Sequence, residues 1–274
     1  MTKIAVTGVT GNLGRIALED LLTRTAPGEV VAIARTPGKA ADLTERGVTV
    51  RHGDYDDAAS LDTAFAGVEV LLLVSGPDVT PGVRVAQHQT AVTAAVRAGV
   101  KRIVYTSAVG AEAGTGFLAD HTATEEAIVR SGLSHTFLRN AFYTEAFVGT
   151  ALAQARETGE VTSSTSGRPL NTATLRDLAL AAAATLTGSE HDNVIYELRG
   201  PLWTYPELAD TLTRALGRPI PHREVTDAEA GRLGSLFPIV RAGAFARTGP
   251  DLPRLLGRPA TGLDAAVTAL LRRR

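Results

Sequence analysis

An α/β fold with a doubly wound parallel sheet is the architecture that the sequence predicts. Over the first 140 residues, short runs of branched aliphatic residues alternate with segments of helical length, as in a parallel sheet with helices on both faces. A glycine-rich turn follows the first run. The stretch 68–74 is apolar almost throughout, which is typical of a strand covered on both faces.

The predicted elements of this region follow one another in a regular order. Strands are expected at residues 4–6, 30–33, 48–50, 70–74, 103–105 and 136–138, and helices at 13–23, 61–65, 83–98 and 122–129. Thr36 with Pro37 reads as an N-cap followed by a first-turn proline, which starts another helix. The strand order typical of this architecture is 3-2-1-4-5-6.

The pattern changes after Asn140. The expected elements there are helices at 142–156 and 175–186, a polar loop at 162–167, a strand at 194–198, and a helix-rich segment from residue 200 on. We therefore predict a first domain over residues 1–140, to which 157–199 returns. A smaller C-terminal lobe over residues 141–274 is expected to carry the substrate pocket.

Composition excludes several classes of function. The chain has 274 residues, of which 44% are hydrophobic and 21% charged, and its net charge is −1, ordinary values for a soluble globular protein. Residues 241–274 hold seven arginines against Asp251 and Asp264. Because no nucleic-acid-binding motif lies among them, they predict a solvated face, so no nucleic-acid partner is expected. Cysteine is absent, which excludes disulfides and thiolate sites.

Other patterns exclude further sites and locations. The first strand begins at once and no apolar run approaches the ~18 residues of a membrane span, so we expect a cytoplasmic protein without a membrane partner. The six histidines show no spacing typical of a catalytic metal site. No GxSxG elbow or GK[ST] phosphate loop is present.

The glycine turn is the strongest local motif. Gly8, Gly11 and Gly14 follow the first strand and open the first helix, with Thr10, Asn12 and Leu13 between them. Glycines permit the tight turn and let a pyrophosphate approach the backbone, and the helix N-terminus attracts it. The alternative is an ordinary glycine-rich turn. In this βαβ context the motif predicts a dinucleotide site of the Rossmann type.

The second strand indicates which dinucleotide binds. It ends in Arg35, where an NAD-preferring site usually has a carboxylate. Arg35 suits a 2′-phosphate, and Lys39 would add a second charge. Solvated surface residues are the alternative for both. We predict NADP(H), with NADPH preferred over NADH.

Residues after the third, fourth and fifth strands are further candidates for cofactor contacts. They are Asp54 and Tyr55, Ser75 and Gly76, and Thr106 and Ser107. Ligands bind at the carboxyl edge of such sheets. A turn or helix cap is the alternative for Asp54, and a strand end or N-cap for Thr106 and Ser107.

With these motifs, the sequence resembles the atypical short-chain dehydrogenase/reductases of the NmrA-like group, and within it the type 2 NAD(P)H:quinone oxidoreductases. The segment Leu138-Arg139-Asn140-x-x-Tyr143 and the pair His121 and Glu125 are the narrower markers. The resemblance implies a Rossmann domain, a small lobe with a substrate cleft between the two, NADPH binding, and quinone reduction without a flavin. Some relatives reduce azo bonds, and others are dinucleotide sensors that regulate a partner.

The superfamily's usual Tyr-x-x-x-Lys motif is absent. The resemblance places His121 where that lysine would lie, and Glu125 follows at i+4 on the same helix face. This pair would orient an imidazole as proton donor, and the alternative is a packed or solvated histidine. Asn140, at the end of the sixth strand, with Phe142 and Tyr143, would contact nicotinamide or a flat acceptor. Core packing is the alternative for the two aromatic residues.

The predicted function is transfer of a hydride from NADPH to a small planar acceptor, most simply a quinone. The catalytic candidates are His121, Glu125, Asn140 and Tyr143. The alternative is a non-catalytic NADP(H) sensor that regulates a protein partner, and the missing Tyr-x-x-x-Lys argues against an epimerase or dehydratase. We expect a monomer or a homodimer.

Overall fold

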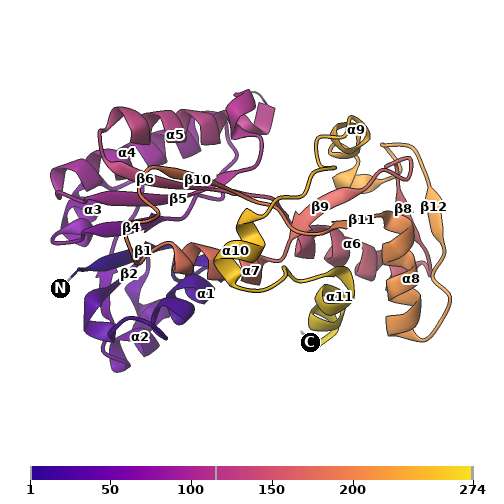
Figure 1. The fold of residues 1–274 in the computed structure, drawn as a ribbon, viewed down its shortest axis with the longest axis horizontal. Helices are drawn as coiled ribbons and strands as arrows, with labels where there is room; N and C mark the ends of the chain where they lie inside the picture. The colour runs from indigo at the N-terminus through magenta and orange to yellow at the C-terminus, as the bar shows by residue number, and fades with distance from the viewer. Residues whose placement is uncertain (1, 115, 273–274) are drawn as a thin grey trace. The chain divides into compact units, whose positions relative to one another are not determined.

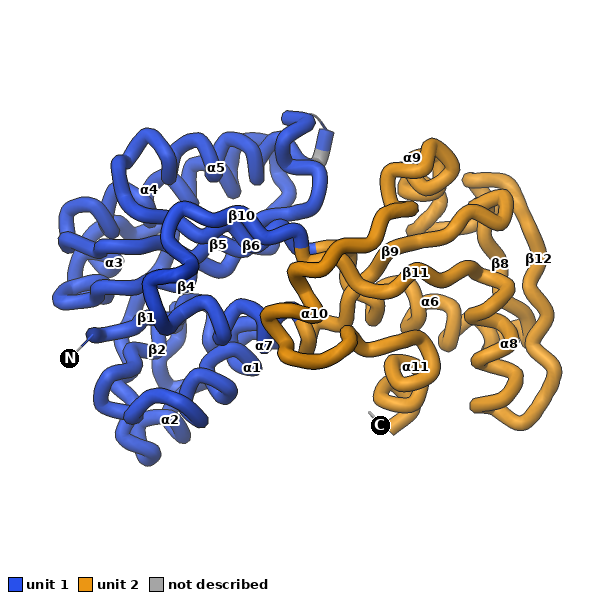
Figure 2. The backbone as a smooth tube through the Cα atoms, viewed as in Figure 1, with its two compact units in different colours: residues 1–140, 178–197 blue, residues 141–177, 198–274 orange. Residues whose placement is uncertain are grey.

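The computed structural model describes residues 2–114 and 116–272, which form two compact units (Figure 2). Unit 1 comprises residues 1–140 and 178–197, and unit 2 comprises residues 141–177 and 198–274. The segment that returns to the first unit is shorter than the expected 157–199. Residues 157–177 belong to unit 2, because two strands in this segment pair there and not in the central sheet.

A seven-stranded sheet forms the centre of unit 1, in the order β10-β6-β5-β4-β1-β2-β3. Its strands are β1 (Ile4–Thr7), β2 (Val30–Ala34), β3 (Thr49–His52), β4 (Val70–Leu73), β5 (Arg102–Ala108), β6 (Ser134–Asn140) and β10 (Val194–Leu198). The neighbouring strands are parallel in each of the pairs β3–β2, β2–β1, β1–β4, β4–β5 and β5–β6. The structure therefore confirms the predicted fold class and the order 3-2-1-4-5-6, with β10 added at the edge beyond β6.

Helices cover both faces of this sheet (Figure 1). The helices of unit 1 are α1 (Asn12–Leu21), α2 (Ala41–Glu45), α3 (Ala58–Phe65), α4 (Val83–Arg97), α5 (Ala119–Arg130) and the later part of α7 (Leu175–Ala184). Short 3₁₀ helices are η1 (Pro27–Glu29), η2 (Pro37–Ala40), η3 (Ala111–Ala113) and η4 (Gly116–Leu118). Helices α3, α4 and α5 lie on one face, and α1 and α2 on the other.

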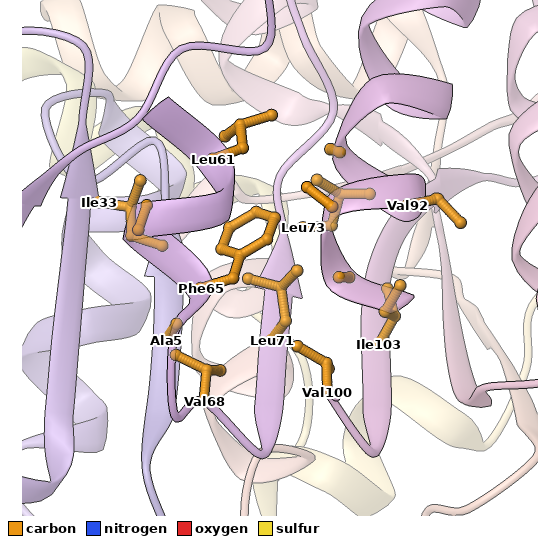
Figure 3. Packing of buried hydrophobic residues seen from close by; sticks show 14 of the residues in the cluster. Ala5, Ile33, Leu61, Phe65, Val68, Leu71, Leu73, Val92, Val100 and Ile103 are labelled. Carbon is orange, nitrogen blue, oxygen red and sulfur yellow. The ribbon is translucent and has the colours of Figure 1, made fainter. Parts of the chain in front are cut away.

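Burial of apolar side chains fixes the position of α3, α4 and α5. Leu61 and Phe65 of α3 pack on Ile33, Leu71 and Leu73 of the sheet (Figure 3). All five side chains are at most 2% exposed. Burying one such side chain stabilises a fold by about 1.5–3 kcal/mol, so this layer holds the carboxyl ends of the strands in a fixed arrangement.

Unit 2 is a smaller mixed lobe. Its strands are β7 (Phe142–Tyr143), β8 (Val161–Ser163), β9 (Leu170–Ala173), β11 (Leu202–Trp203) and β12 (His222–Glu224), and its helices are α6 (Thr144–Glu157), the start of α7, α8 (Tyr205–Leu216), η5 (Gly231–Leu233), α9 (Phe237–Arg241), α10 (Asp251–Leu256) and α11 (Leu263–Arg272). Strands β11, β9 and β7 form one sheet, and β12 and β8 another.

Two local expectations were wrong, and a third was confirmed only in part. The polar loop expected at 162–167 begins inside strand β8, because Ser163 is buried and β8 pairs with β12 some 60 residues later. The helix expected from residue 142 begins at Thr144, after the short strand β7. Thr36 occupies an N-cap position, but its side chain makes no capping hydrogen bond, and a 3₁₀ turn follows it.

Several arginines of the basic C-terminal segment are paired within unit 2. Arg241 bonds Asp227, and Arg258 bonds the buried Asp177; Arg273 and Arg274 lie outside the described residues. Among residues 2–114 and 116–272, no helix is long and apolar enough to span a bilayer. The same residues hold no group of three or more His, Asp or Glu side chains placed to bind a metal ion.

Candidate dinucleotide site and reacting end

Each glycine of the first turn has its own structural reason. Gly8 has a φ of +64°, and its carbonyl accepts a hydrogen bond from the Gly11 amide at 2.9 Å. A Cβ on Gly14 would lie 2.5 Å from the Gly8 oxygen and 2.7 Å from the Thr7 oxygen. No side chain at this position clears the backbone, so only glycine lets α1 begin so close to β1.

The start of α1 is left open to a ligand. Gly11 is its N-cap and supplies no side-chain hydrogen bond, and no acidic residue lies in the first turn. The first amide N–H groups of a helix have no partner within the helix, and together with the helix dipole they favour a bound anion. This turn therefore fits the pyrophosphate of a dinucleotide.

A cavity of about 720 Å³ surrounds this turn. It is lined by most of the predicted cofactor residues, namely Gly8, Thr10, Gly11, Asn12, Leu13, Gly14, Arg35, Asp54, Tyr55, Ser75 and Gly76. Thr7, Ile33, Ala34, Gly53, Asp56, Val74, Pro77, Asp78 and Gln87 complete the lining. Lys39, Thr106 and Ser107 are not part of it.

Arg35 lies at the end of β2, where its side chain is exposed at the rim of this cavity. Within residues 2–114 and 116–272 its guanidinium has no ion pair or hydrogen bond. The neighbouring Arg15 differs, because Glu19 and Asp42 already bind its guanidinium. Arg35 is therefore the cation at this rim that is available to a phosphate. Lys39 lies in η2 and is exposed.

Tyr55 and Thr7 join the strand ends beneath the cavity. The Tyr55 hydroxyl lies 2.6 Å from the Thr7 hydroxyl and 2.8 Å from the Val74 carbonyl, and the Val74 amide donates to Thr7 at 2.9 Å. Burial raises the pKa of the Tyr55 phenol, so it stays protonated and continues to donate. Its hydroxyl thus fixes the ends of β1 and β4, and Tyr55 itself is part of the cavity lining.

Thr106 supports the cavity from outside. It is buried, and its hydroxyl accepts the Ser75 amide at 2.8 Å. The structure therefore places Thr106 behind the segment that carries Ser75 and Gly76. Asp54 is part of the cavity lining, and its Oδ1 accepts a hydrogen bond from the Asp56 amide at 3.2 Å. Asp54 therefore stabilises the turn and also lies at the cavity.

His121 is hydrogen-bonded to a buried tyrosine. Its Nδ1 lies 2.8 Å from the hydroxyl of Tyr105 on β5. The Tyr105 hydroxyl is also 3.5 Å from Nδ1 of His88 on α4. Burial, together with the positive charge of Arg84, lowers the pKa of His121 to about 4, and burial lowers that of His88 to about 3. Both imidazoles are therefore neutral near pH 7.

Glu125 does not bond His121, the partner expected from the sequence, but other side chains. Its carboxylate accepts two hydrogen bonds from Arg139, at 3.1 Å and 2.8 Å, and one from the Ser107 hydroxyl at 2.5 Å. No hydrogen bond joins it to His121 among the described residues. The i+4 spacing predicted a shared helix face, but the guanidinium on β6 offers the carboxylate a bidentate ion pair. Ser107 is thereby engaged with Glu125 instead of the cavity.

Asn140 and Tyr143 lie in different units. Asn140 ends β6 in unit 1 and is 8% exposed, and its side-chain Oδ1 has no hydrogen-bond partner among the described residues. Tyr143 belongs to unit 2 and is 37% exposed. Phe142 packs edge-on against Phe147 and Phe245 within unit 2, as its core-packing alternative expects.

Sequence reasoning missed His88 and much of the cavity lining. His88 is fully buried, and its Nε2 accepts the amide of Gly76, which lines the cavity. A lone histidine in a helix carries no signal for this contact. Gly53 could have been suspected from its position directly after β3, because a Cβ there would lie 2.6 Å from Ile33.

The parallel sheet, the glycine turn and the open helix start define a dinucleotide-binding protein of the Rossmann class. Residues 8–187 match the model of the NAD(P)H-binding family, and the chain belongs to this family. It is 36% identical to quinone oxidoreductase 2 of Escherichia coli strain K12, over 97% of this chain and 98% of that protein.

Solved structures give the same result. Triphenylmethane reductase of Citrobacter sp., complexed with NADP(H), matches with a TM-score of 0.91 and 36% identity over 97% of this chain and 99% of its own. An NADPH complex of the E. coli NADPH-dependent quinone oxidoreductase QOR2 matches with a TM-score of 0.88 and 34% identity, over 98% and 100%. These findings confirm the resemblance and the prediction of an NAD(P)H-dependent oxidoreductase.

Proposed function

We propose that this protein reduces a quinone, or a similarly flat and easily reduced acceptor, with NADPH. The observation that carries the proposal is the glycine-lined cavity with an unpaired arginine at its rim. The choice of acceptor is supported by the quinone oxidoreductase that shares 36% of its residues with this chain over nearly its full length.

The unit 1 residues divide the work of holding NADPH. The amides at the start of α1 bind the pyrophosphate, and Gly14 and Gly11 keep the backbone clear for it. Arg35 binds the 2′-phosphate, since no carboxylate competes for its guanidinium. This arrangement favours NADPH over NADH, because NADH lacks the only group that Arg35 would bind.

At the reacting end, Asn140 and His121 are the proposed contacts. NADPH supplies the hydride when bound. The Oδ1 of Asn140 is a buried acceptor without a partner, and such an atom is costly unless a donor reaches it. We assign it to the carboxamide of the nicotinamide.

His121 acts as a hydrogen-bond donor in this proposal. Because its pKa is lowered to about 4, the imidazole is neutral at pH 7 and donates a hydrogen bond without losing its proton. The acceptor oxygen gains negative charge as the hydride arrives, and the imidazole N–H stabilises it. Water supplies the proton that completes the hydroquinone. Glu125 acts indirectly, through Arg139 and Ser107.

The direct test measures NADPH oxidation by the purified protein with and without a simple naphthoquinone, under anaerobic conditions. We expect turnover that depends on the quinone and produces one hydroquinone per NADPH. His121→Ala should lower kcat by about 10²-fold, the usual cost of removing one hydrogen-bond donor to a developing oxyanion. His135→Ala is the control. His135 lies at the start of β6, away from the carboxyl ends of the strands, so this variant should leave kcat unchanged.

Two results would contradict the proposal. Tight NADPH binding without turnover across a panel of quinones would favour a dinucleotide sensor. Full turnover by His121→Ala would remove the role of the histidine while leaving the quinone reductase activity intact.

A further inference from the structure

We infer that His88 and Tyr105 are positioning residues that hold His121 in a single tautomer, with its proton on Nε2. The inference rests on the proposed donor role of His121. It assigns a task to two buried side chains that neither touch the reacting atoms nor belong to the predicted site.

A backbone amide sets the tautomer of His88. The Gly76 N–H donates to Nε2 of His88 at 3.0 Å. A peptide N–H can only donate, so Nε2 of His88 carries the lone pair and the proton of this neutral imidazole sits on Nδ1. The hydroxyl of Thr124 lies 2.9 Å from Nδ1 and donates its own hydrogen bond to the Asp120 carbonyl at 2.7 Å. Thr124 is therefore free to accept, and the tautomer of His88 is fixed.

The fixed tautomer of His88 determines where the Tyr105 proton points. The phenol oxygen lies 3.5 Å from Nδ1 of His88 and 2.8 Å from Nδ1 of His121. Nδ1 of His88 bears a proton and cannot accept a hydrogen bond. The Thr124 oxygen also interacts with the phenol, but it is already engaged by the proton on Nδ1 of His88. The Tyr105 hydroxyl therefore donates to Nδ1 of His121, and burial keeps this phenol protonated by raising its pKa.

His121 is left with one possible arrangement. Because its Nδ1 accepts from Tyr105, the proton of the neutral ring is on Nε2. Among the described residues, no hydrogen bond occupies Nε2, so this N–H remains available for an acceptor. The chain of contacts begins at Gly76, which lines the dinucleotide cavity. The cofactor-binding segment thus sets the orientation of the donor through hydrogen bonds alone.

The test is a long-range ¹H–¹⁵N NMR spectrum of the full-length protein labelled at the histidine nitrogens, recorded near pH 7.5. This spectrum distinguishes the two neutral tautomers and the charged ring. We expect His88 as the Nδ1–H tautomer and His121 as the Nε2–H tautomer, with the two signals assigned by His88→Gln and His121→Ala. The Nδ1–H tautomer at His121, or Nε2–H at His88, would overturn the inference.

Tyr105→Phe removes the hydroxyl and keeps the ring that packs against His88 and His121. We expect His121 to lose its pure Nε2–H signature and kcat for naphthoquinone to fall by about tenfold, roughly the worth of one hydrogen bond. The KM for NADPH should stay unchanged. An unaltered His121 signature in this variant would refute the role of Tyr105.

The chain offers a matched control. Tyr196 is also buried, and its hydroxyl lies 2.8 Å from Nδ1 of another histidine, His191. Tyr196→Phe removes the same kind of bond in the same unit, so it should alter the His191 signature and leave that of His121 and kcat unchanged. A similar loss of kcat in both variants would show a general structural effect and contradict the inference.

The experiments separate this inference from the proposed function. If His121→Ala keeps full turnover while the wild-type tautomers are as expected, the positioning network stands and the donor role fails. If His121→Ala loses turnover while Tyr105→Phe leaves the His121 spectrum unchanged, the donor role stands and the positioning role fails.

Discussion

The sharpest prediction concerns Gly14→Ala. The new Cβ would lie 2.5 Å from the Gly8 oxygen, 2.7 Å from the Gly8 carbonyl carbon and 2.7 Å from the Thr7 oxygen. These are backbone atoms, so no side-chain rotation relieves the contact. To reach ordinary van der Waals distance, the start of α1 must retreat from the turn by about 0.9 Å.

Two effects follow from that retreat. Overpacking of this kind lowers the free energy of unfolding by about 1–3 kcal/mol. The helix amides also move away from the pyrophosphate, and each lost hydrogen bond to a charged group costs about 1.5–3 kcal/mol. We therefore expect the Kd for NADPH to rise by at least tenfold, measured by titration calorimetry on protein that is still folded.

A graded series makes the reasoning refutable. A Cβ on Gly11 would lie 3.3 Å from the Gly8 oxygen, and a Cβ on Gly28 meets nothing within 4 Å. The loss of affinity should therefore decrease from Gly14→Ala to Gly11→Ala and vanish in Gly28→Ala. Equal losses at Gly14 and Gly28, or unchanged NADPH affinity in Gly14→Ala, would contradict the assignment of this turn as the pyrophosphate site.

Three further predictions concern cofactor choice, acid stability and a buried ion pair. Arg35→Ala should raise the KM for NADPH by about 10–100-fold and should change the KM for NADH little. Lys39→Ala should change both KM values less than Arg35→Ala does. Steady-state kinetics with each dinucleotide measure these values. His88 has a folded-state pKa near 3, below its usual value of about 6.5, so between these pH values the unfolded chain binds a proton that the folded chain does not. The contribution of His88 to the free energy of unfolding should therefore fall by about 2 kcal/mol from pH 6.5 to 4.5, and a urea series in which His88→Gln shows the same pH slope as the wild type would refute this. Arg139→Met leaves the buried Glu125 without its guanidinium and should lower the free energy of unfolding by about 3 kcal/mol, and adding Glu125→Gln should restore most of it.

The sheet was predictable because its signals are local and repeated. Strands β1, β2 and β4 are short aliphatic runs, and the βα alternation leaves few possible topologies. Strand β8 lacked such a signal. Ser163 has a buried side chain that bonds His222 at 2.9 Å, so a polar run is stabilised by a partner strand far along the chain. No local pattern shows such pairing.

The site divides in the same way. The glycines and Arg35 could be predicted because short sequence motifs identify both the tight turn after β1 and the end of β2. The partners of Glu125 and His121 could not, because helical spacing shows which residues share a face and not what packs against it. Arg139 lies 14 residues from Glu125, and Tyr105 lies 16 residues before His121. Both partners come from strands, and tertiary packing decided the contacts.

The neutral state of His121 also bears on the class of acceptor. With a pKa of about 4, only about one imidazole in a thousand is charged at pH 7, so this group is a poor proton source. An aliphatic ketone would yield an alkoxide that must be protonated as it forms, and the Tyr-x-x-x-Lys motif that performs this task is absent. A reduced quinone is phenol-like, with a pKa near ~10, and one donated hydrogen bond stabilises its oxygen until water protonates it. The neutral, buried imidazole of His121 and the absence of the Tyr-x-x-x-Lys motif therefore agree with one another. Both favour an acceptor whose reduced product is a weakly basic oxyanion.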